Sequence, residues 1–423
     1  MPLTPDGANE PQPGDLLFHL RRGEEHQREG RLEKAEAEFR RAIELEPENS
    51  AGHRSLGIAL EARGRKEEAE EAFRRALELS PEKSESHRSL GIHLGERGRL
   101  PEAEAELRKA LELEPGEAKN HAALGIALER QGRREEAEAE LRRAVELAPE
   151  SPEIRRSLAI GLVEQGRLGE GEAEFRRAVD LSPGEAANHH DLGICLTLQN
   201  RPEEAEAEFR KAVDLAPKDP TSLRSLANVL DGRGLFDEAE EQYRRVLELD
   251  PGNAEDHRAL GVNFARQGRP EEAEAEFRKA VDLAPEDATA HHDLGVNLVQ
   301  SGDDKKAEAE FRRAIELDPD DFVIRRSLGK LLTEKGRYEE AVEVDRELIR
   351  LAPDDDTSYR DLGIDLESLG RYKEAEQAYR RAVRLAPDDP VARRSLGLSL
   401  EQQERYGEAE ECYRRAVELA LRR

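Results

Sequence analysis

The chain has 423 residues, of which 36% are apolar and 38% are charged, and its formal net charge at pH 7 is −28. This charge argues against nucleic acid and anionic lipid as partners, because basic surfaces bind both. No run of 18 apolar residues predicts a membrane-spanning helix, and residues 1–15 lack the regions of a signal peptide. Cys195 and Cys412 lie far apart without C-x-x-C spacing, so we expect no disulfide framework, no zinc site and a reducing, cytoplasmic setting.

The chain begins with a proline-rich segment, residues 1–15, which we predict to be a flexible tail. After it, proline recurs every 34 residues, at Pro47, Pro81, Pro115, Pro149, Pro183, Pro217, Pro251, Pro285, Pro319, Pro353 and Pro387. This period divides residues 16–423 into twelve repeats, which start at residues 16, 50, 84, 118, 152, 186, 220, 254, 288, 322, 356 and 390. A fixed period of this size indicates an array of similar structural units.

Each repeat carries two apolar stripes of helical spacing. In the second repeat the stripes are His53, Leu56, Gly57 and Leu60, followed by Ala69, Phe73, Ala76, Leu77 and Leu79. Gly64 lies between them, where a helix end favours glycine, and Pro81 cannot continue the second helix. The repeat is therefore predicted to be a helix–turn–helix, and the chain to be all-α.

The residues "HRSLGIAL…EEAEEAFRRALELSP" at 53–81 resemble the tetratricopeptide repeat pattern, W-x-x-L-G-x-x-Y…A-x-x-x-F…A…P. The resemblance extends over residues 16–423, with His or Arg where the family often has Trp, and Leu where it often has Tyr. It implies a right-handed α-solenoid whose first helices line a concave groove, with positions two, five, nine, twelve and thirteen of each repeat facing that groove. The fold implies a scaffold that binds other proteins.

Histidine is frequent at position four of the repeat, at His19, His53, His87, His121, His189, His257 and His291. This position shares a helical stripe with positions seven and eleven, so we predict that these side chains pack between helices. A metal site is the alternative, but H-E-x-x-H is absent and the cysteine or carboxylate partners lack i, i+4 spacing. The sequence therefore predicts no metal ion and no cofactor.

Position five is cationic in ten repeats, at Arg54, Arg88, Arg156, His190, Arg224, Arg258, His292, Arg326, Arg360 and Arg394. Position nine is mostly apolar, as at Ile58, Ile92, Ile126, Ile160 and Ile194, with Asn228 and Lys330 as exceptions. Because the resemblance places both positions in the groove, they form the predicted site for an extended or helical, acidic protein segment. Guanidinium groups would bind its carboxylates there. Groove sites of the family that grip a terminal carboxylate commonly have Asn at position nine, which is rare here.

An alternative interpretation of these arginines needs no ligand. Pairs of acidic residues stand just before several repeats, as at Asp354 and Asp355, and the position-five arginine that follows them could pair with them. Exposed ion pairs of this kind contribute only about 0–1 kcal/mol. The second helices carry similar charge pairs four residues apart, as at Glu36, Arg40 and Glu44, which indicates a solvated face.

The terminal repeats differ from the others. In the first, Arg22 and His26 replace the leucines at positions seven and eleven, as suits a polar cap. After the last, no covering helix follows, so Tyr413, Val417 and Leu421 form a candidate self-association face. Stacking of copies through that face would not close and would give filaments or oligomers. A self-assembling structural protein is therefore the alternative function.

The sequence contains no P-loop, no dinucleotide-binding glycine motif after a strand, no G-x-S-x-G and no candidate triad, so we predict that the chain is not an enzyme. One residue interrupts the pattern: Asp345 stands where other repeats have Phe39, Phe73, Phe175, Tyr243 or Tyr379. An unpaired buried carboxylate would cost several kcal/mol or stay protonated. We therefore expect local repacking, with the Asp345 carboxylate reaching the edge of the helix pair.

Overall fold

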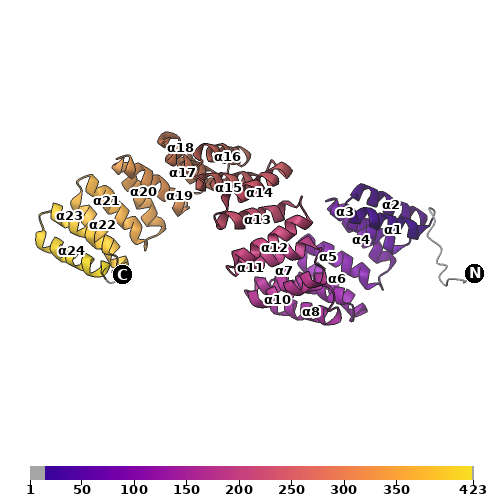
Figure 1. Cartoon of the computed structure of the whole chain (residues 1–423). Helices are drawn as coiled ribbons and strands as arrows, with labels where there is room; N and C mark the ends of the chain where they lie inside the picture. The colour runs from indigo at the N-terminus through magenta and orange to yellow at the C-terminus, as the bar shows by residue number, and fades with distance from the viewer. Residues whose placement is uncertain (1–14, 422–423) are drawn as a thin grey trace, which may run out of the picture. The chain divides into compact units, whose positions relative to one another are not determined.

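The computed structural model describes residues 15–421, and all regular secondary structure in this range is α-helical (Figure 1). The helices come in consecutive pairs, and the first helix of each pair begins 34 residues after the previous one. This confirms the predicted all-α, helix–turn–helix solenoid fold. The predicted flexible tail, residues 1–15, lies outside the described residues except for Asp15, the residue before the first helix.

The described chain divides between Pro217 and Lys218 into two compact units. The first unit contains α1 (Leu16–Arg28), α2 (Leu32–Leu45), α3 (Ser50–Ala62), α4 (Lys66–Leu79), α5 (Ser84–Glu96), α6 (Leu100–Leu113), α7 (Ala118–Arg130), α8 (Arg134–Leu147), α9 (Pro152–Glu164), α10 (Leu168–Leu181), α11 (Ala186–Leu198) and α12 (Pro202–Leu215).

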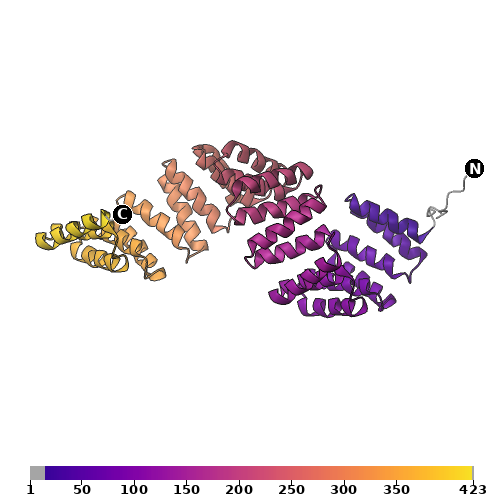
Figure 2. The same ribbon diagram turned by 60° about the horizontal axis from the view of Figure 1, so that its bottom comes forward.

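The second unit contains α13 (Pro220–Gly232), α14 (Phe236–Leu249), α15 (Ala254–Arg266), α16 (Pro270–Leu283), α17 (Ala288–Gln300), α18 (Asp304–Leu317), α19 (Phe322–Glu334), α20 (Tyr338–Leu351), α21 (Asp356–Ser368), α22 (Tyr372–Leu385), α23 (Pro390–Gln402) and α24 (Tyr406–Ala420). Within each unit every helix packs on the next, and Figure 2 shows the same pairs from another side. None of the described helices is both long enough and apolar enough to cross a bilayer.

Local sequence signals set where the helices start and stop. The Asp321 carboxylate accepts hydrogen bonds from the backbone N–H groups of Val323 (2.7 Å) and Ile324 (2.9 Å), which the first turn of α19 leaves unpaired. The first helix of most pairs ends at a residue in the left-handed region, such as Gly64 with φ of 75°. Glycine adopts this conformation without strain, because it has no Cβ.

The core of each repeat lies between its two helices. A Cβ atom added at Gly57 would lie 2.7 Å from the Phe73 ring, and one added at Gly295 would lie 2.7 Å from the Phe311 ring. Both rings are buried. Glycine at position eight therefore lets the first helix approach the aromatic residue at position twenty-four of the second helix.

Candidate functional site

Apolar side chains at position nine form an exposed row on the first helices. In the first compact unit, Ile58, Ile92, Ile126 and Ile194 are 37–44% exposed, whereas Ile160 is half-buried. In the second unit, Ile364 and Leu398 continue the pattern, and Val262 and Val296 are half-buried. We call the surface made by positions five and nine of the first helices the first-helix face. Asn228 is exposed on this face and accepts a hydrogen bond from the Tyr243 hydroxyl (2.8 Å).

Three hollows lie between successive first helices of the second unit. One of about 350 Å³ lies between α15 and α17, one of about 270 Å³ between α17 and α19, and one of about 320 Å³ between α19 and α21. The first two share Val296, and the last two share Lys330. Because both shared residues stand at position nine, the hollows follow one another along the first-helix face.

Most position-five arginines bind a residue of the following repeat, and two, Arg326 and Arg360, bind the last residue of their own repeat. Arg224 holds the fully buried Asp256 through Nε and Nη2 (2.5 and 2.7 Å). The other pairs are Arg156 with Asp191 (2.5 Å), Arg326 with Asp355 (2.7 Å), Arg88 with Asn120 (3.0 Å), Arg258 with Asp293 (3.1 Å), Arg54 with Glu85 (3.3 Å) and Arg360 with Asp389 (3.6 Å). His190 and His292 lie 3.3 Å from Asp191 and Asp293. No ion pair of Arg394 is found within residues 15–421. Pairing is therefore common, with acids that follow the arginine in sequence.

The histidines at position four join the two helices of a repeat to the turn before it. His87 Nδ1 lies 2.7 Å from the Glu106 carboxylate, and Nε2 lies 2.9 Å from the carbonyl oxygen of Pro81. Arg155 takes the same place, with Nη1 2.6 Å from Glu174 and Nε 2.8 Å from the Pro149 carbonyl oxygen. Among the described residues no group of three or more potential ligands could hold a metal ion. These contacts favour the packing interpretation of the histidines.

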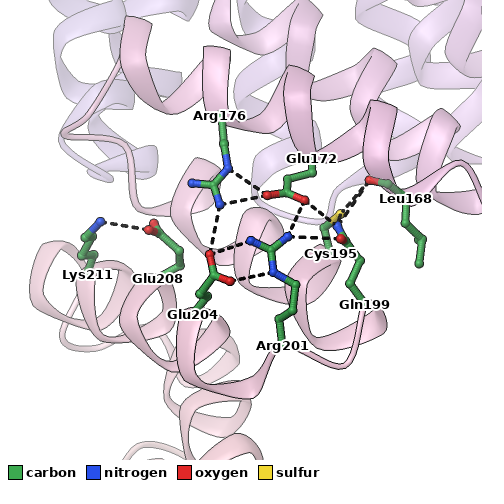
Figure 3. A network of polar contacts seen from close by, with 9 residues as sticks. All are labelled: Leu168, Glu172, Arg176, Cys195, Gln199, Arg201, Glu204, Glu208 and Lys211. Atoms are coloured by element: carbon green, nitrogen blue, oxygen red, sulfur yellow. Dashed lines mark hydrogen bonds and ion pairs between the residues drawn. The ribbon is translucent and has the colours of Figure 1, made fainter.

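A second set of arginines links most repeats to the one before them. Arg201, at position sixteen, binds Glu204 through two bonds (2.7 and 2.6 Å) and Glu172 of the preceding repeat through Nη1 (2.7 Å), as Figure 3 shows. Glu172 also accepts from Gln199 (2.9 Å) and Arg176 (2.9 Å). The same arrangement recurs at Arg65, Arg99, Arg133, Arg167, Arg269, Arg337 and Arg405. We call it the arginine ladder.

The ladder changes the acidity of its carboxylates. Burial raises the pKa of Glu172, but hydrogen bonds from Gln199, Arg176 and Arg201 outweigh it and leave the pKa below its ordinary value. The corresponding bonds lower the pKa of Glu104 to about 2 against the same opposing burial. The glutamate at position twenty-one is thus held ionised between two repeats, and it does more than support its own helix.

Asp345 departs from the expectation made for it. The residue is only 3% exposed, so its carboxylate is buried and does not reach the edge of the helix pair, and Oδ2 has no hydrogen-bond partner. A Cβ atom added at Gly329 would lie 3.6 Å from Asp345 Oδ1, where most other repeats place an aromatic ring. The neighbouring Asp365 is 1% exposed, and its Oδ2 accepts a bond from the Thr333 hydroxyl (3.0 Å). Burial first, and then Asp365 and Asp361, raise the pKa of Asp345 well above its ordinary value.

The predicted self-association face is only partly available. Val417 and Leu421 are 59% and 82% exposed on α24 and just after it. Tyr413, by contrast, packs against Gly397 and donates a hydrogen bond to Glu401 (2.6 Å). Val417 and Leu421 are therefore exposed for a contact, whereas Tyr413 is already engaged within its own repeat.

Sequence reasoning missed three residues around Asp345 and the links made by the arginine ladder. Thr333, Asp361 and Asp365 give little sign in the sequence, although Asp365 stands at position ten, where other repeats have Ala127, Cys195 or Asn263. The ladder had a stronger signal. Arginine recurs at position sixteen with glutamate three residues later and another glutamate 29 residues earlier.

Comparison with known proteins gives a family match and several structural similarities. Family models described as "Tetratricopeptide repeat" match residues 20–84, 156–220, 224–288 and 360–420, which is over half of the chain, and also 320–388, 96–160 and 264–322. No curated protein matches the sequence.

Three solved structures illustrate the structural similarity. YrrB, described as a TPR protein with an unusual peptide-binding site, shares 25% identity over 44% of this chain and 96% of its own (TM-score 0.39). The pilF protein of Pseudomonas aeruginosa shares 23% over 48% and 94% (TM-score 0.42). Yeast Tom70 shares 18% over 96% and 92% (TM-score 0.42).

Proposed function

The chain belongs to the tetratricopeptide repeat family, whose members generally serve as protein-binding scaffolds, and we propose that it is a non-catalytic scaffold that binds an extended or helical protein segment along its first-helix face. The observation that carries this proposal is the row of exposed isoleucines at position nine. Four side chains of one kind, one per repeat on α3, α5, α7 and α11, suit the apolar side chains of a segment that crosses successive repeats.

The experiment tests this row directly. A random peptide library displayed on phage is selected against the full chain, and the affinity of a selected synthetic peptide is measured by calorimetry. The triple variant Ile92→Ser, Ile126→Ser, Ile194→Ser should bind at least about tenfold more weakly, since each isoleucine buried on binding contributes more than ~1 kcal/mol.

The matched control removes exposed apolar side chains elsewhere. Leu181 and Leu215 are similarly exposed at the ends of second helices, and Leu181→Ser with Leu215→Ser should leave the affinity unchanged. Equal losses of affinity in both variants, or an unchanged affinity in the triple variant, would show that the first-helix face does not bind the peptide.

We further propose that acidic residues of the segment bind at those position-five arginines of the second unit whose ion pairs are longest. Arg258 and Arg360 lie 3.1 and 3.6 Å from their carboxylate partners, so a ligand carboxylate can compete there. Arg224 is unsuitable for such a test, because its reversal to glutamate would face the buried Asp256. Arg258→Gln with Arg360→Gln should weaken an acidic peptide and flatten the salt dependence of its affinity. An unaltered salt dependence would show that Arg258 and Arg360 do not bind the acidic residues of the peptide.

Self-association is the second candidate, because Val417 and Leu421 are exposed together. If it occurs, sedimentation velocity should show open-ended species that grow with protein concentration. Val417→Ser with Leu421→Ser should then restore a single species. Growth that persists in this variant would exclude α24 as the contact. Cytoplasmic location, and the absence of nucleic-acid and membrane partners, stay predictions.

A further inference from the structure

The hollow between α19 and α21 differs from its neighbours because a carboxylic acid lines it. Asp345 contributes this group from α20, at the place where a ring fills the core of other repeats. Apolar atoms of Leu348 and Ile364 also line the hollow, and its volume is about 320 Å³. Ile364 is exposed at position nine, so the hollow lies beside the apolar row of the first-helix face.

The Asp345 carboxyl is prepared to receive a hydrogen-bond donor. Its Oδ2 atom is buried without a partner, although the residue lines an unfilled space. Asp365 has a second such atom, since its Oδ1 also lacks a partner while Thr333 serves Oδ2. Unsatisfied buried acceptors are rare in folded proteins, because each one costs about 1–3 kcal/mol or more. Here the two carboxyl groups hydrogen-bond to each other through the proton that Asp345 retains, so a cation that enters the hollow would replace this shared proton as their partner.

The charges around Asp345 favour a cationic donor. From α19 it faces Arg326, Lys330 and Glu334, from α21 it faces Asp361 and Asp365, and the Tyr379 phenol of α22 lies near these two acids. Arg326 is already engaged with Asp355 (2.7 Å), and Lys330 is exposed at position nine. The carboxyl groups therefore outnumber the cations that could neutralise them.

We propose that this pocket receives the cationic head of one lysine or arginine side chain from the bound protein segment, with its aliphatic stem against Leu348 and Ile364. The proposal rests on the function proposed above, because the segment must cross the first-helix face at α19 and α21. It adds a basic anchor to a face whose other charged positions are arginines. Basic side chains bury their stems on apolar surface while the charged head finds a partner.

Binding moves one proton. In the empty chain, burial and the neighbouring Asp365 and Asp361 hold the pKa of Asp345 above its ordinary value, so the carboxyl keeps its proton at neutral pH. When a guanidinium or ammonium group enters, this proton leaves to the solvent and the carboxylate pairs with the cation. The affinity should therefore rise about tenfold per pH unit for as long as Asp345 stays protonated in the empty chain.

The test uses n-butylguanidinium as the probe, since a guanidinium stays charged throughout the working pH range. The full chain carries methyl labels at Thr333, Leu348 and Ile364, and the titration is followed by NMR at pH 6, 7 and 8. We expect shifts of these three methyl groups and a dissociation constant that falls about tenfold per pH unit. The neutral analogue n-butylurea should bind more weakly and without pH dependence.

Two variants and one matched control complete the experiment. Asp345→Asn keeps the shape but cannot ionise, and Asp345→Tyr refills the space as Tyr379 does, so both should abolish the response to the probe. The control is Asp293→Asn. Asp293 stands at the same repeat position as Asp361, two repeats earlier, and its replacement should leave the titration unchanged.

Several outcomes would overturn the proposal. They are equal binding of n-butylurea, a response that survives Asp345→Asn, or the same shifts from Ca²⁺ or Mg²⁺ at lower concentration, which would indicate a metal site. The probe needs no segment, so its failure leaves binding along the first-helix face untouched. Conversely, if a selected peptide binds equally well after its basic residues are replaced, the segment does not use this pocket, even if the probe does.

Discussion

Two neighbouring repeats, residues 288–321 and 322–355, have helices of equal length but different cores. In the first, the Phe311 ring lies beneath Gly295 and lines a hollow of about 270 Å³; in the second, Asp345 lies beneath Gly329 and lines one of about 320 Å³. Both first helices have 13 residues and both second helices have 14. The comparison teaches that the helix pair does not need the ring to keep its form, because the remaining apolar positions hold it. A repeat can therefore replace its core ring with an acid and keep both of its helices.

The largest effect is expected when an acid replaces the core ring of the regular repeat, residues 288–321. Phe311→Asp should lower the free energy of unfolding by about 4 kcal/mol, because a buried ring is lost and an acid enters an apolar core. The midpoint of urea unfolding, followed by circular dichroism, measures this. Phe311→Tyr is the matched control and should cost little, since Tyr379 is buried at the equivalent place. A loss below about 1 kcal/mol for Phe311→Asp would mean that other repeats also tolerate an acid at this core position.

The reverse change should stabilise the chain. Asp345→Tyr should raise the free energy of unfolding by about 2 kcal/mol, because it buries an aromatic ring in unfilled space. The melting temperature should rise with it. Leu348 stands where most repeats have alanine, so Asp345→Tyr with Leu348→Ala should recover any part of the gain that crowding prevents. A fall in melting temperature for both variants would show that the carboxylate has a stabilising partner.

Asp345 should also make the stability of the chain depend on pH, which the Phe311 ring does not. The pKa of Asp345 is raised in the folded chain, whereas the unfolded chain ionises it near pH ~4. Its contribution is therefore fully present below that pH, and is lost as the pH rises through the folded-state pKa, by about 1.4 kcal/mol per unit. Asp345→Asn removes this dependence, so the stability gained by the variant should widen between pH 5 and pH 8. A gap that stays constant would contradict a retained proton.

The smallest effect concerns the two glycines. Gly295→Ala brings a Cβ within 2.7 Å of the Phe311 ring, whereas at Gly329 the nearest atom is Val344 Cγ1 at 3.2 Å. Alanine favours a helix by about 1 kcal/mol over glycine, which offsets crowding only where the neighbour can move. We expect Gly295→Ala to be less stable than Gly329→Ala by about 1 kcal/mol in thermal unfolding. Equal values would mean that the Phe311 ring shifts freely.

The fold follows from the sequence because its period is strict. Pro81, Gly64 and the ring at Phe73 recur with few exceptions, and each marks one point of a helix pair through its own backbone or packing requirement. The packing role of His87 was also predictable, since its spacing placed it on the buried stripe. Its second bond, to the carbonyl of Pro81, needed the structure because the turn conformation decides it.

The candidate site was less predictable, because charges choose partners in three dimensions. Arg326 has acids before and after it in the sequence, and only the structure shows that it binds Asp355 at the end of its own repeat. Asp345 was recognised as an exception, but its burial was not, since sequence alone does not tell an edge from a hollow. Asp365 escaped notice because a single polar residue at a variable position carries no pattern.

The arginine ladder has a consequence for how such a chain can change over generations. Each ladder arginine reaches a glutamate 29 residues earlier, so loss or duplication of one whole repeat in the first unit, where every junction has such a pair, leaves this spacing intact. Recombination between similar repeats can thus shorten or lengthen the first unit without breaking these contacts between repeats. The acids Asp345 and Asp365 are different, because they belong to two particular neighbours and would be parted by an insertion between them. Repeats joined by the arginine ladder make similar contacts with their neighbours, whereas the two repeats that hold Asp345 and Asp365 depend on each other.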